Sequence, residues 1–518
     1  MNNKNFSGNT SPYLQGNFAP VLEEITVDNL KVIGHLPRDL NGLYVRNGPN
    51  PRLPPKGSYH WFDGDGMIHG VHFEDGRASY RNRFIATAGF LHEKKKGRAV
   101  WNGLTGFPSA RQMLFPPAGL RAKNVANTSL VWHEGRLLAL WEVGEPHVID
   151  VPGLETLGHL DTGLKCKAFT AHPKVDSASG EMVFFGMQMG PRPSLHYGVA
   201  DRQGQLSYSI RIPLRDSVFM HDFAITANYT LFMDLPYLFS LKSMVTKGVP
   251  FTFKQSQPSR FGIMPRFGTA NDIVWFEDDP CFVFHTLNAY ELLDDAGSVE
   301  EIILVACRMK RGTIAALPGH TKSASNKDAT RKLPLSLNDA ARLHEWRFNM
   351  KTGKVKSTQL DDRASDFPRF NEHLMGAQNQ FGYVASVQVN ENNGAPEFTE
   401  IIKHDLKTGS MLTRPYGSGH FAGEAVFVPR SRKSSHGASE QVMDNSEDDG
   451  WLLSHVFDAQ SESSELLVID ASTLDAEPVA RIRLPQRVPY GFHGTWIPAD
   501  TVECLVAADG LSVTDRKK

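Results

Sequence analysis

The stretch Leu343-His-Glu-Trp-Arg-Phe-Asn349-Met-Lys-Thr352-Gly353 joins a strand-like run to the turn that ends it. Its first part is rich in aliphatic and aromatic residues, which is typical of a β-strand. The side chain of asparagine or aspartate can bond to the backbone ahead of it and so hold a turn. The same order of strand, Asp or Asn, and Thr three residues later returns at Asp405–Thr408 and at Asp470–Thr473. We therefore predict one recurring type of hairpin.

The three threonines of these turns are 56 and 65 residues apart, slightly more than the ~40–50 residues of a four-stranded propeller blade. Closely spaced strands, few long helices and a weak repeat favour a β-propeller over a β-sandwich. Further strand-like runs are predicted at residues 42–46, 68–73, 78–83, 137–143, 181–187, 208–212, 282–289, 302–307, 383–389, 398–404, 451–457, 465–469 and 479–483. At roughly 60–70 residues per unit, we expect an all-β, seven-bladed propeller that spans residues 1–518 as a single domain.

Several segments interrupt this rhythm. Residues 1–35 resemble an extended N-terminal leader with a short strand. Residues 107–124 and 235–261 are apolar but irregular or weakly helical, and long apolar connections often cover a cavity. We expect them to form an α-helical and loop cap over the active-site face. Residues 319–333 and 431–449 are polar and are predicted to be solvated loops.

The composition excludes several classes of protein. A net charge of -2 gives no basic surface for nucleic acid, so no nucleic-acid partner is expected. The four cysteines lack CxxC spacing, which argues against a disulfide scaffold or a thiolate metal site and fits a reducing compartment. The N-terminus is polar, Arg is absent from the first 37 residues, and no run of ~18 apolar residues occurs. We therefore expect a cytoplasmic protein.

Four of the 20 histidines lie at the edges of apolar strand-like runs and are candidate metal ligands: His172, His221, His285 and His493. Gaps of 49, 64 and 208 residues exclude a local binding motif. The inner strands of a propeller all surround one axis, so histidines from several blades can converge there. Neutral imidazole suits Fe, Cu, Ni or Zn, and the lack of cysteine ligands excludes a structural zinc ribbon. Four such ligands leave two positions of an octahedral metal free for O2 and substrate, or for water.

Motifs from one end of the chain to the other resemble the carotenoid cleavage oxygenase family, especially the bacterial apocarotenoid oxygenases. They are Asn41-Gly-Leu-Tyr-Val-Arg-Asn-Gly-Pro-Asn-Pro51, Trp61-Phe-Asp-Gly-Asp-Gly-Met67, Ala126-Asn-Thr-Ser129, Leu138-Ala-Leu-Trp-Glu142, Ala171-His-Pro-Lys174, Met220-His-Asp-Phe223, Phe284-His285, Asp366-Phe-Pro-Arg369, Gly423-Glu-Ala-Val-Phe-Val428 and Gly491-Phe-His-Gly-Thr-Trp496. Each motif alone is weak, but their combination in this order is specific.

The resemblance implies a seven-bladed propeller with an axial Fe(II) held by the four histidines. It also implies three carboxylates that bond to the outer ring nitrogens of three ligands, and these map onto Glu142, Asp366 and Glu424. Such partners set the direction and basicity of the imidazoles. Asp366 stands where the family usually has Glu, so its bond is expected to be longer, bridged by water or made by a shifted backbone. Thr128 maps near the open iron position; a simple strand-end hydrogen bond is the alternative role.

The implied reaction joins O2 to a C=C double bond and releases two carbonyl products, without an organic cofactor. An apolar polyene substrate needs an aromatic tunnel, for which we predict the lining residues Trp141, Phe219, Phe284 and Phe367. The apolar stretches at 107–120 and 235–245 are expected to touch a membrane surface peripherally and take up substrate there.

Three other functions remain as alternatives. Relatives that cleave phenolic stilbenes typically place a lysine just before the first of the three carboxylates, where this chain has Trp141. An indole cannot stabilise a phenolate, so a carotenoid or apocarotenoid is favoured. Retinoid isomerisation occurs in the same family. A metal-free propeller scaffold would not explain four histidines with three partner acids.

Overall fold

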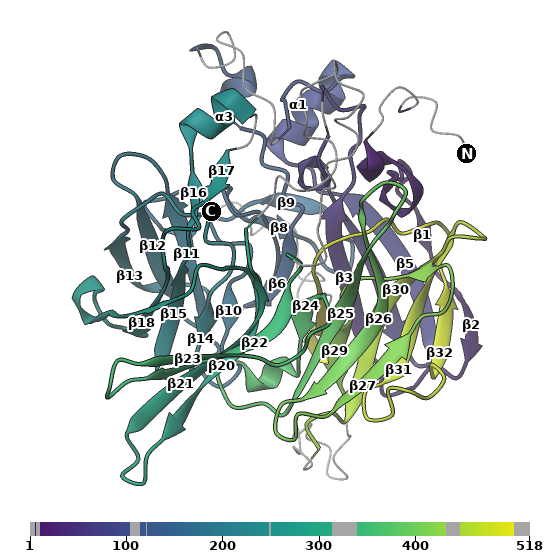
Figure 1. The fold of residues 1–518 in the computed structure, drawn as a ribbon. Helices are drawn as coiled ribbons and strands as arrows, with labels where there is room; N and C mark the ends of the chain where they lie inside the picture. Colours follow the sequence, from purple (N-terminus) through teal and green to yellow (C-terminus); the bar gives the residue numbers. More distant parts are fainter. Residues whose placement is uncertain are drawn as a thin grey trace.

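Seven antiparallel sheets stand around one axis, which confirms the predicted seven-bladed β-propeller (Figure 1). The computed structural model describes residues 6, 11–57, 59–103, 114–120, 122–247, 250–312, 339–430 and 446–501. Apolar side chains pack between neighbouring sheets, which is how a propeller buries both faces of each blade.

The blades follow one another along the chain. Blade 1 has the order β1-β5-β4-β3-β33, with β1 Thr26–Val27, β3 Gly42–Pro49, β4 Gly66–Glu74, β5 Arg77–Phe84 and β33 Gly494–Pro498. Blade 2 contains β6 Ser129–His133, β7 Arg136–Leu140, β8 His147–Ile149 and β9 Thr156–His159. Blade 3 contains β10 Lys174–Val175, β11 Met182–Gln188, β12 Ser194–Ala200 and β13 Leu206–Pro213. Blade 4 contains β14 Ala224–Ile225, β15 Tyr229–Asp234, β18 Ser259–Pro265 and β19 Val274–Asp278.

The second half repeats this arrangement. Blade 5 contains β20 Phe282–Leu293, β21 Val299–Met309, β22 Arg342–Asn349 and β23 Val355–Gln359. Blade 6 contains β24 Ser365–Arg369, β25 Phe381–Val389, β26 Pro396–Asp405 and β27 Met411–Pro415. Blade 7 contains β2 Lys31–Gly34, β28 His420–Phe421, β29 Val426–Pro429, β30 Gly450–Asp458, β31 Ser463–Asp470 and β32 Ala480–Arg483.

The two ends of the chain close the ring by exchanging strands. Strand β33, from the C-terminal end, pairs with β3, and β2, from the N-terminal end, pairs with β32. The expected leader is therefore built into the ring, because its strands complete two blades. Its aromatic side chains are also buried, with Tyr13 and Phe18 packed around Trp61.

The three predicted hairpin turns are confirmed by their hydrogen bonds. Asn349 Oδ1 accepts from the Thr352 backbone N–H at 2.8 Å. Asp405 Oδ1 accepts from the Thr408 N–H at 3.0 Å, and Asp470 Oδ1 accepts from the Ser472 N–H at 2.9 Å. These turns join β22 to β23, β26 to β27 and β31 to β32.

The turn after Asp405 gives a first testable prediction. Gly409 has φ 74° and open space around it, so backbone conformation alone limits a substitution there. Gly409→Ala is expected to lower the free energy of unfolding by about 1 kcal/mol, because an alanine is strained in the left-handed region. Gly409→Asn should lose less, since asparagine tolerates that region. Urea unfolding of both variants measures the difference, and equal losses would contradict the reason given.

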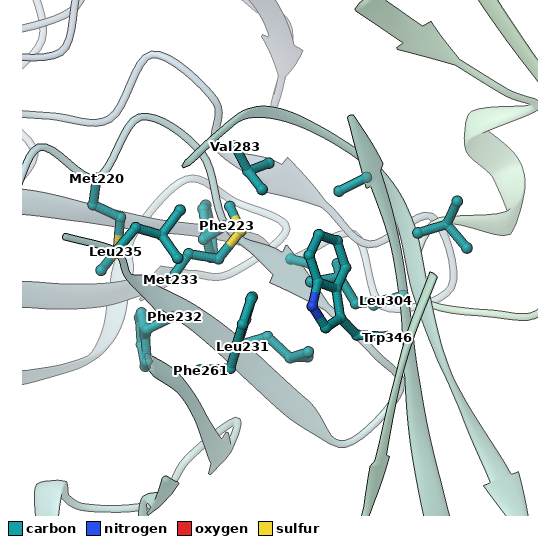
Figure 2. Packing of buried hydrophobic residues seen from close by; sticks show 14 of the residues in the cluster. Met220, Phe223, Leu231, Phe232, Met233, Leu235, Phe261, Val283, Leu304 and Trp346 are labelled. Atoms are coloured by element: carbon teal, nitrogen blue, oxygen red, sulfur yellow. The ribbon is translucent and has the colours of Figure 1, made fainter. Parts of the chain in front are cut away.

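The largest hydrophobic cluster lies in blades 3, 4 and 5 and includes the segment around His221. Figure 2 shows Met220 and Phe223, which lie just before and just after His221 in the chain, packed among side chains of β15. The same cluster contains Trp346, whose Nε1–H donates to Asp278 Oδ2 at 2.8 Å. The His221 backbone is therefore anchored in a rigid core.

A cap of short elements stands at one end of the propeller (Figure 1). It contains α1 (Ala88–Lys96), α3 (Leu241–Lys247) and a hairpin of β16 (Tyr237–Phe239) with β17 (Phe251–Phe253). Helix α1, absent from our prediction, begins at Thr87, whose side chain accepts from the Phe90 N–H at 3.2 Å. None of the described helices is long and apolar enough to cross a membrane.

Parts of the predicted irregular segments lie outside the described residues. These parts are residues 107–113, 121, 248–249, 319–333 and 431–445. Of the first cap segment, the described portion contains a 3-10 turn at Pro117–Gly119. Of the second, it contains the β16–β17 hairpin, α3 and the start of β18.

Candidate metal centre

The innermost strand of every blade brings one polar residue to the same region of the axis. Each residue lies just before its strand or near its start, where the backbone leaves the sheet. In chain order they are Thr128 before β6, His172 before β10, His221 before β14, His285 in β20, Asp366 in β24, Glu424 before β29 and His493 before β33. Positions that are remote in sequence become neighbours because the ring is closed.

The four predicted histidines meet with their Nε2 atoms directed at one another. His172 Nε2 is 3.0 Å from His221 Nε2, and His285 Nε2 is 3.1 Å from His493 Nε2. Ligand atoms of His172, His285 and His493 all lie within 4.8 Å of one another. Burial, together with the other three imidazoles, holds the pKa of His172 well below its usual range. A neutral imidazole has a lone pair to offer, so this donor set fits a metal ion.

Three of the four histidines have a carboxylate at the outer ring nitrogen. The Nδ1 to oxygen distances are 2.8 Å for His221 to Glu142, 2.8 Å for His285 to Asp366 and 2.9 Å for His493 to Glu424. An Nδ1–H that donates to a carboxylate leaves the Nε2 lone pair facing the centre. The hydrogen bonds of His285 and His493 therefore select the tautomer that metal binding requires, and the Glu142 carboxylate beside His221 Nδ1 favours the same tautomer.

Glu142 and Glu424 remain ionised in spite of their burial. Burial alone would raise the pKa of Glu142, but the hydrogen bond and charge of His221 hold it below its usual value. Burial alone would also raise the pKa of Glu424, but Arg369 and His493 lower this pKa to about 2. Glu424 Oε2 also accepts from the Gly494 backbone N–H at 2.7 Å. An ionised carboxylate is the stronger acceptor for an imidazole N–H.

Asp366 reaches His285 directly although its side chain is one methylene shorter than glutamate. The pairing register of β24 with β25 shifts between Asp366 and Arg369, and Phe367 has φ 55°. The irregularity therefore lies at Asp366 itself. The direct distance of 2.8 Å means that the bond is neither lengthened nor bridged by water. A second register shift, between Val283 and Thr286, surrounds His285.

Removing the charge of Asp366 should weaken metal binding without unfolding the protein. Asp366→Asn keeps the side-chain shape but offers a neutral acceptor to His285 Nδ1–H. Partners of this kind typically contribute 10–100-fold to metal affinity, and we expect a loss of about tenfold. Competition titration with a metal indicator measures it. A variant with unchanged affinity would show that Asp366 does not orient His285.

His172 differs from the other three histidines. Among the residues that the structure describes, no carboxylate lies at hydrogen-bonding distance from its ring. Its backbone N–H donates to Thr170 Oγ1 at 3.0 Å. This bond restrains the backbone segment that carries the imidazole.

Thr128 is tied to one of the acids. Its Oγ1–H donates to Glu142 Oε2 at 3.4 Å, and its carbonyl accepts from the His493 N–H at 3.3 Å. The strand-end hydrogen bond expected as its alternative role also exists, from Thr128 N–H to the Leu140 carbonyl at 3.1 Å. Strand β7 ends at Leu140, earlier than the predicted run 137–143, and Glu142 lies in the following turn. Glu142 reaches His221 because the chain leaves the sheet there.

A cavity of about 520 Å³ opens onto His221, His285 and His493. All four aromatic residues predicted for a tunnel line it: Trp141, Phe219, Phe284 and Phe367. Sequence reasoning missed seven further aromatic residues of the wall, namely Tyr59, Trp61, Phe62, Trp101, Phe251, Phe398 and Phe492. Three of them, Trp61, Phe62 and Phe492, lie within motifs already recognised, which was the available signal. The cap contributes to this cavity, because Glu93 of α1 lines it.

Comparisons with known proteins identify the family of this chain. Residues 18–498 match the family model described as retinal pigment epithelial membrane protein. The chain is 39% identical to carotenoid 9,10(9',10')-cleavage dioxygenase 1 of Pisum sativum, covering 95% of this chain and 91% of that protein. It is 33% identical to the carotenoid cleavage oxygenase of Mycobacterium tuberculosis, covering 94% and 98%.

Two solved structures share the fold closely. A lignostilbene dioxygenase of Pseudomonas brassicacearum superposes with a TM-score of 0.80 at 30% identity, covering 95% of this chain and 99% of that one. A variant of the Synechocystis apocarotenoid oxygenase superposes with a TM-score of 0.78 at 28% identity, covering 92% and 97%.

Proposed function

Since the chain belongs to the carotenoid cleavage oxygenase family, we propose that it is a non-haem Fe(II) dioxygenase that cleaves a C=C double bond of a carotenoid or apocarotenoid. One O2 adds across the bond and two carbonyl products leave, so atoms and electrons balance without an external reductant. The observation that carries the proposal is the meeting of four imidazoles at one wall of an aromatic cavity.

The metal would be held by the Nε2 atoms of the four histidines. Imidazole donors without cysteine suit Fe(II), and the carboxylates at three outer nitrogens add negative charge around a dication. When bound, Fe(II) supplies the redox chemistry that makes O2 reactive toward an alkene.

The protein itself positions the substrate and excludes water. Eleven Phe, Trp and Tyr side chains line the cavity, so an extended apolar polyene gains free energy by leaving water for it. Phe284 and Phe367 flank His285, with Phe367 stacked on its ring at a centroid distance of 5.3 Å. These two rings support one segment of the polyene beside the metal position, which is the contribution expected of positioning in catalysis.

Cleavage of phenolic stilbenes is the second candidate, because a lignostilbene dioxygenase shares the fold. The position just before Glu142 is Trp141, which offers no cation to a phenolate. Lys123 also lines the cavity, but its ammonium lies 2.5 Å from Asp65 and 2.6 Å from Glu93. Neither Trp141 nor the ion-paired Lys123 therefore offers a free cation to a phenolate.

The deciding experiment loads the purified protein with Fe(II) without oxygen and then adds O2 with either apocarotenals or resveratrol-type stilbenes. Masses of the aldehyde products identify both the substrate class and the bond that is cut. We expect cleavage of the apocarotenals. Cleavage of stilbenes alone would establish the second candidate, and a folded protein that binds no iron would remove the proposal.

The cap is proposed to touch a membrane surface. Large apolar side chains are exposed on it, with Leu114 at 75%, Phe115 at 74% and Leu241 at 60%. Lysines at the end of α1 add positive charge suited to anionic lipid headgroups. We predict co-sedimentation with anionic lipid vesicles and its loss in a Leu114→Ser, Phe115→Ser double variant. Equal sedimentation of the variant would contradict this surface. A cytoplasmic location stays a prediction.

A further inference from the structure

Three of the candidate metal ligands are each followed, one or two residues later in the chain, by a residue whose side chain contacts the other two such residues. Lys174 lies two residues after His172, Asp222 follows His221, and Thr286 follows His285. Lys174 Nζ is 2.7 Å from Asp222 Oδ1 and 3.2 Å from Thr286 Oγ1. Asp222 Oδ2 accepts from the Thr286 Oγ1–H at 2.8 Å.

This buried triad, Lys174–Asp222–Thr286, connects the inner strands of blades 3, 4 and 5. Asp222 is 1% exposed, and the other two residues are also buried. The Lys174 ammonium additionally faces the ring of Phe223 at 5.8 Å. A buried ion pair gains little net free energy over an apolar pair of the same shape, but it restricts the positions of the segments that carry it.

Asp222 also binds the backbone at the bulge that directs His285. Its Oδ2 accepts from the Thr286 backbone N–H at 2.7 Å, directly after His285 and where the register of β20 shifts. One carboxylate therefore holds the amide next to His285, while its own backbone continues from His221. Through Lys174, the same carboxylate holds the segment of His172.

Of the four candidate ligands, His172 is the one whose ring has no carboxylate at hydrogen-bonding distance among the described residues. The position of its Nε2 therefore depends on the position of its backbone. Only Pro173 separates it from Lys174, and the restricted φ of proline makes this connection stiff. A displacement of Lys174 is thus passed on to His172.

We propose that Asp222, acting through Lys174 and Thr286, is the positioning residue of the metal centre, setting the spacing of His172, His221 and His285. Asp222 acts on His172 through the backbone of its segment, whereas the outer carboxylates lie at the rings of the other three histidines. This inference rests on the proposed function, because it concerns the same metal site.

The chain contains a matched control for a purely structural role. Lys403 Nζ lies 2.5 Å from Asp448 Oδ2, both residues are buried, and the ammonium faces the ring of Phe381 at 4.3 Å. This pair has the same chemistry as Lys174 with Asp222, but neither residue lines the cavity or contacts any of the four histidines.

The test uses Co²⁺ as the probe, because its visible absorption bands report coordination geometry without turnover. Metal-free wild type, Asp222→Asn, Thr286→Val, Thr286→Ser and the control Asp448→Asn are titrated with Co²⁺, and thermal unfolding is followed in parallel. We expect Asp222→Asn to lose about tenfold or more in affinity and to change the band pattern. Asp448→Asn should lower the unfolding temperature comparably but keep the wild-type bands and affinity.

Thr286 provides the second measurement if Asp222→Asn fails to fold. Thr286→Val keeps size and removes only the hydroxyl, so it should change the Co²⁺ bands, whereas Thr286→Ser should restore them. If Asp222→Asn folds and keeps the wild-type bands and affinity, the inference is overturned. If Asp222→Asn does not fold, wild-type bands and affinity in Thr286→Val overturn it. Such a result would leave the proposed function intact, since the wild type would still bind the metal. Wild type that binds no Co²⁺ would overturn both.

Discussion

The variant His221→Ala is expected to lose bound iron and double-bond cleavage together. His221 is 6% exposed, and its Nε2 lies 3.0 Å from that of His172. Alanine removes one of four ligands and leaves the buried Glu142 carboxylate without its imidazole partner. Three neutral ligands bind a dication far more weakly than four. Iron content measured by mass spectrometry should fall below one-tenth of the wild-type value, and product formation should fall with it.

A buried histidine away from the axis serves as the control for this prediction. His344 is also buried, but its Nε2 bonds to Ser357 Oγ at 2.6 Å within blade 5. His344→Ala should destabilise the fold while keeping stoichiometric iron. Turnover that persists in His221→Ala would contradict the assignment of this ligand.

The variant Glu424→Ala is expected to lose both stability and metal. Glu424 is 3% exposed and accepts from His493 Nδ1, the Gly494 N–H and Arg369 Nη1, the last at 3.4 Å. Without the carboxylate, a backbone N–H and part of a guanidinium are left buried without an acceptor. Breaking a buried ion pair in this way costs about 3–5 kcal/mol, and loss of the imidazole partner reduces metal affinity by about 10–100-fold.

An exposed carboxylate on the same arginine is the matched control. Glu372 lies 2.7 Å from Arg369 Nη2 and is 50% exposed. Glu372→Ala should cost less than about 1 kcal/mol, because water replaces an exposed ion pair at little cost. Denaturant unfolding of the metal-free Glu424→Ala and Glu372→Ala variants measures the two losses of stability. Equal unfolding midpoints for both variants would show that Glu424 is not the anchor described here.

The number of blades and their turns were readable from the chain because their causes are local. Asn349, Asp405 and Asp470 each bond to a backbone amide two or three residues ahead. Such a turn depends on a few adjacent residues and repeats with each blade. The structure likewise brings together the four histidines and the three acids, whose motifs had been recognised through a family resemblance.

Other features depended on contacts that no local pattern contains. Residues 1–35 were predicted as an extended leader with a short strand, and no local pattern shows that β2 pairs with β32 of the last blade. The run 137–143 was predicted as one strand, but β7 ends at Leu140 and leaves Glu142 free to meet a histidine of another blade. The register shift at Asp366 likewise arises in the pairing of β24 with β25.

The sequence by itself determined the type of strand and the turns between strands, because periodicity and side-chain hydrogen bonding act over a few residues. The residues with metal-binding chemistry were recognised in the sequence through a family resemblance. The tertiary structure alone decided that His285 and His493, 208 residues apart, lie 3.1 Å from each other. The tertiary structure also decided that the side chains of Lys174, Asp222 and Thr286 contact one another. These distances follow from closing the ring of blades, and ring closure depends on every blade at once.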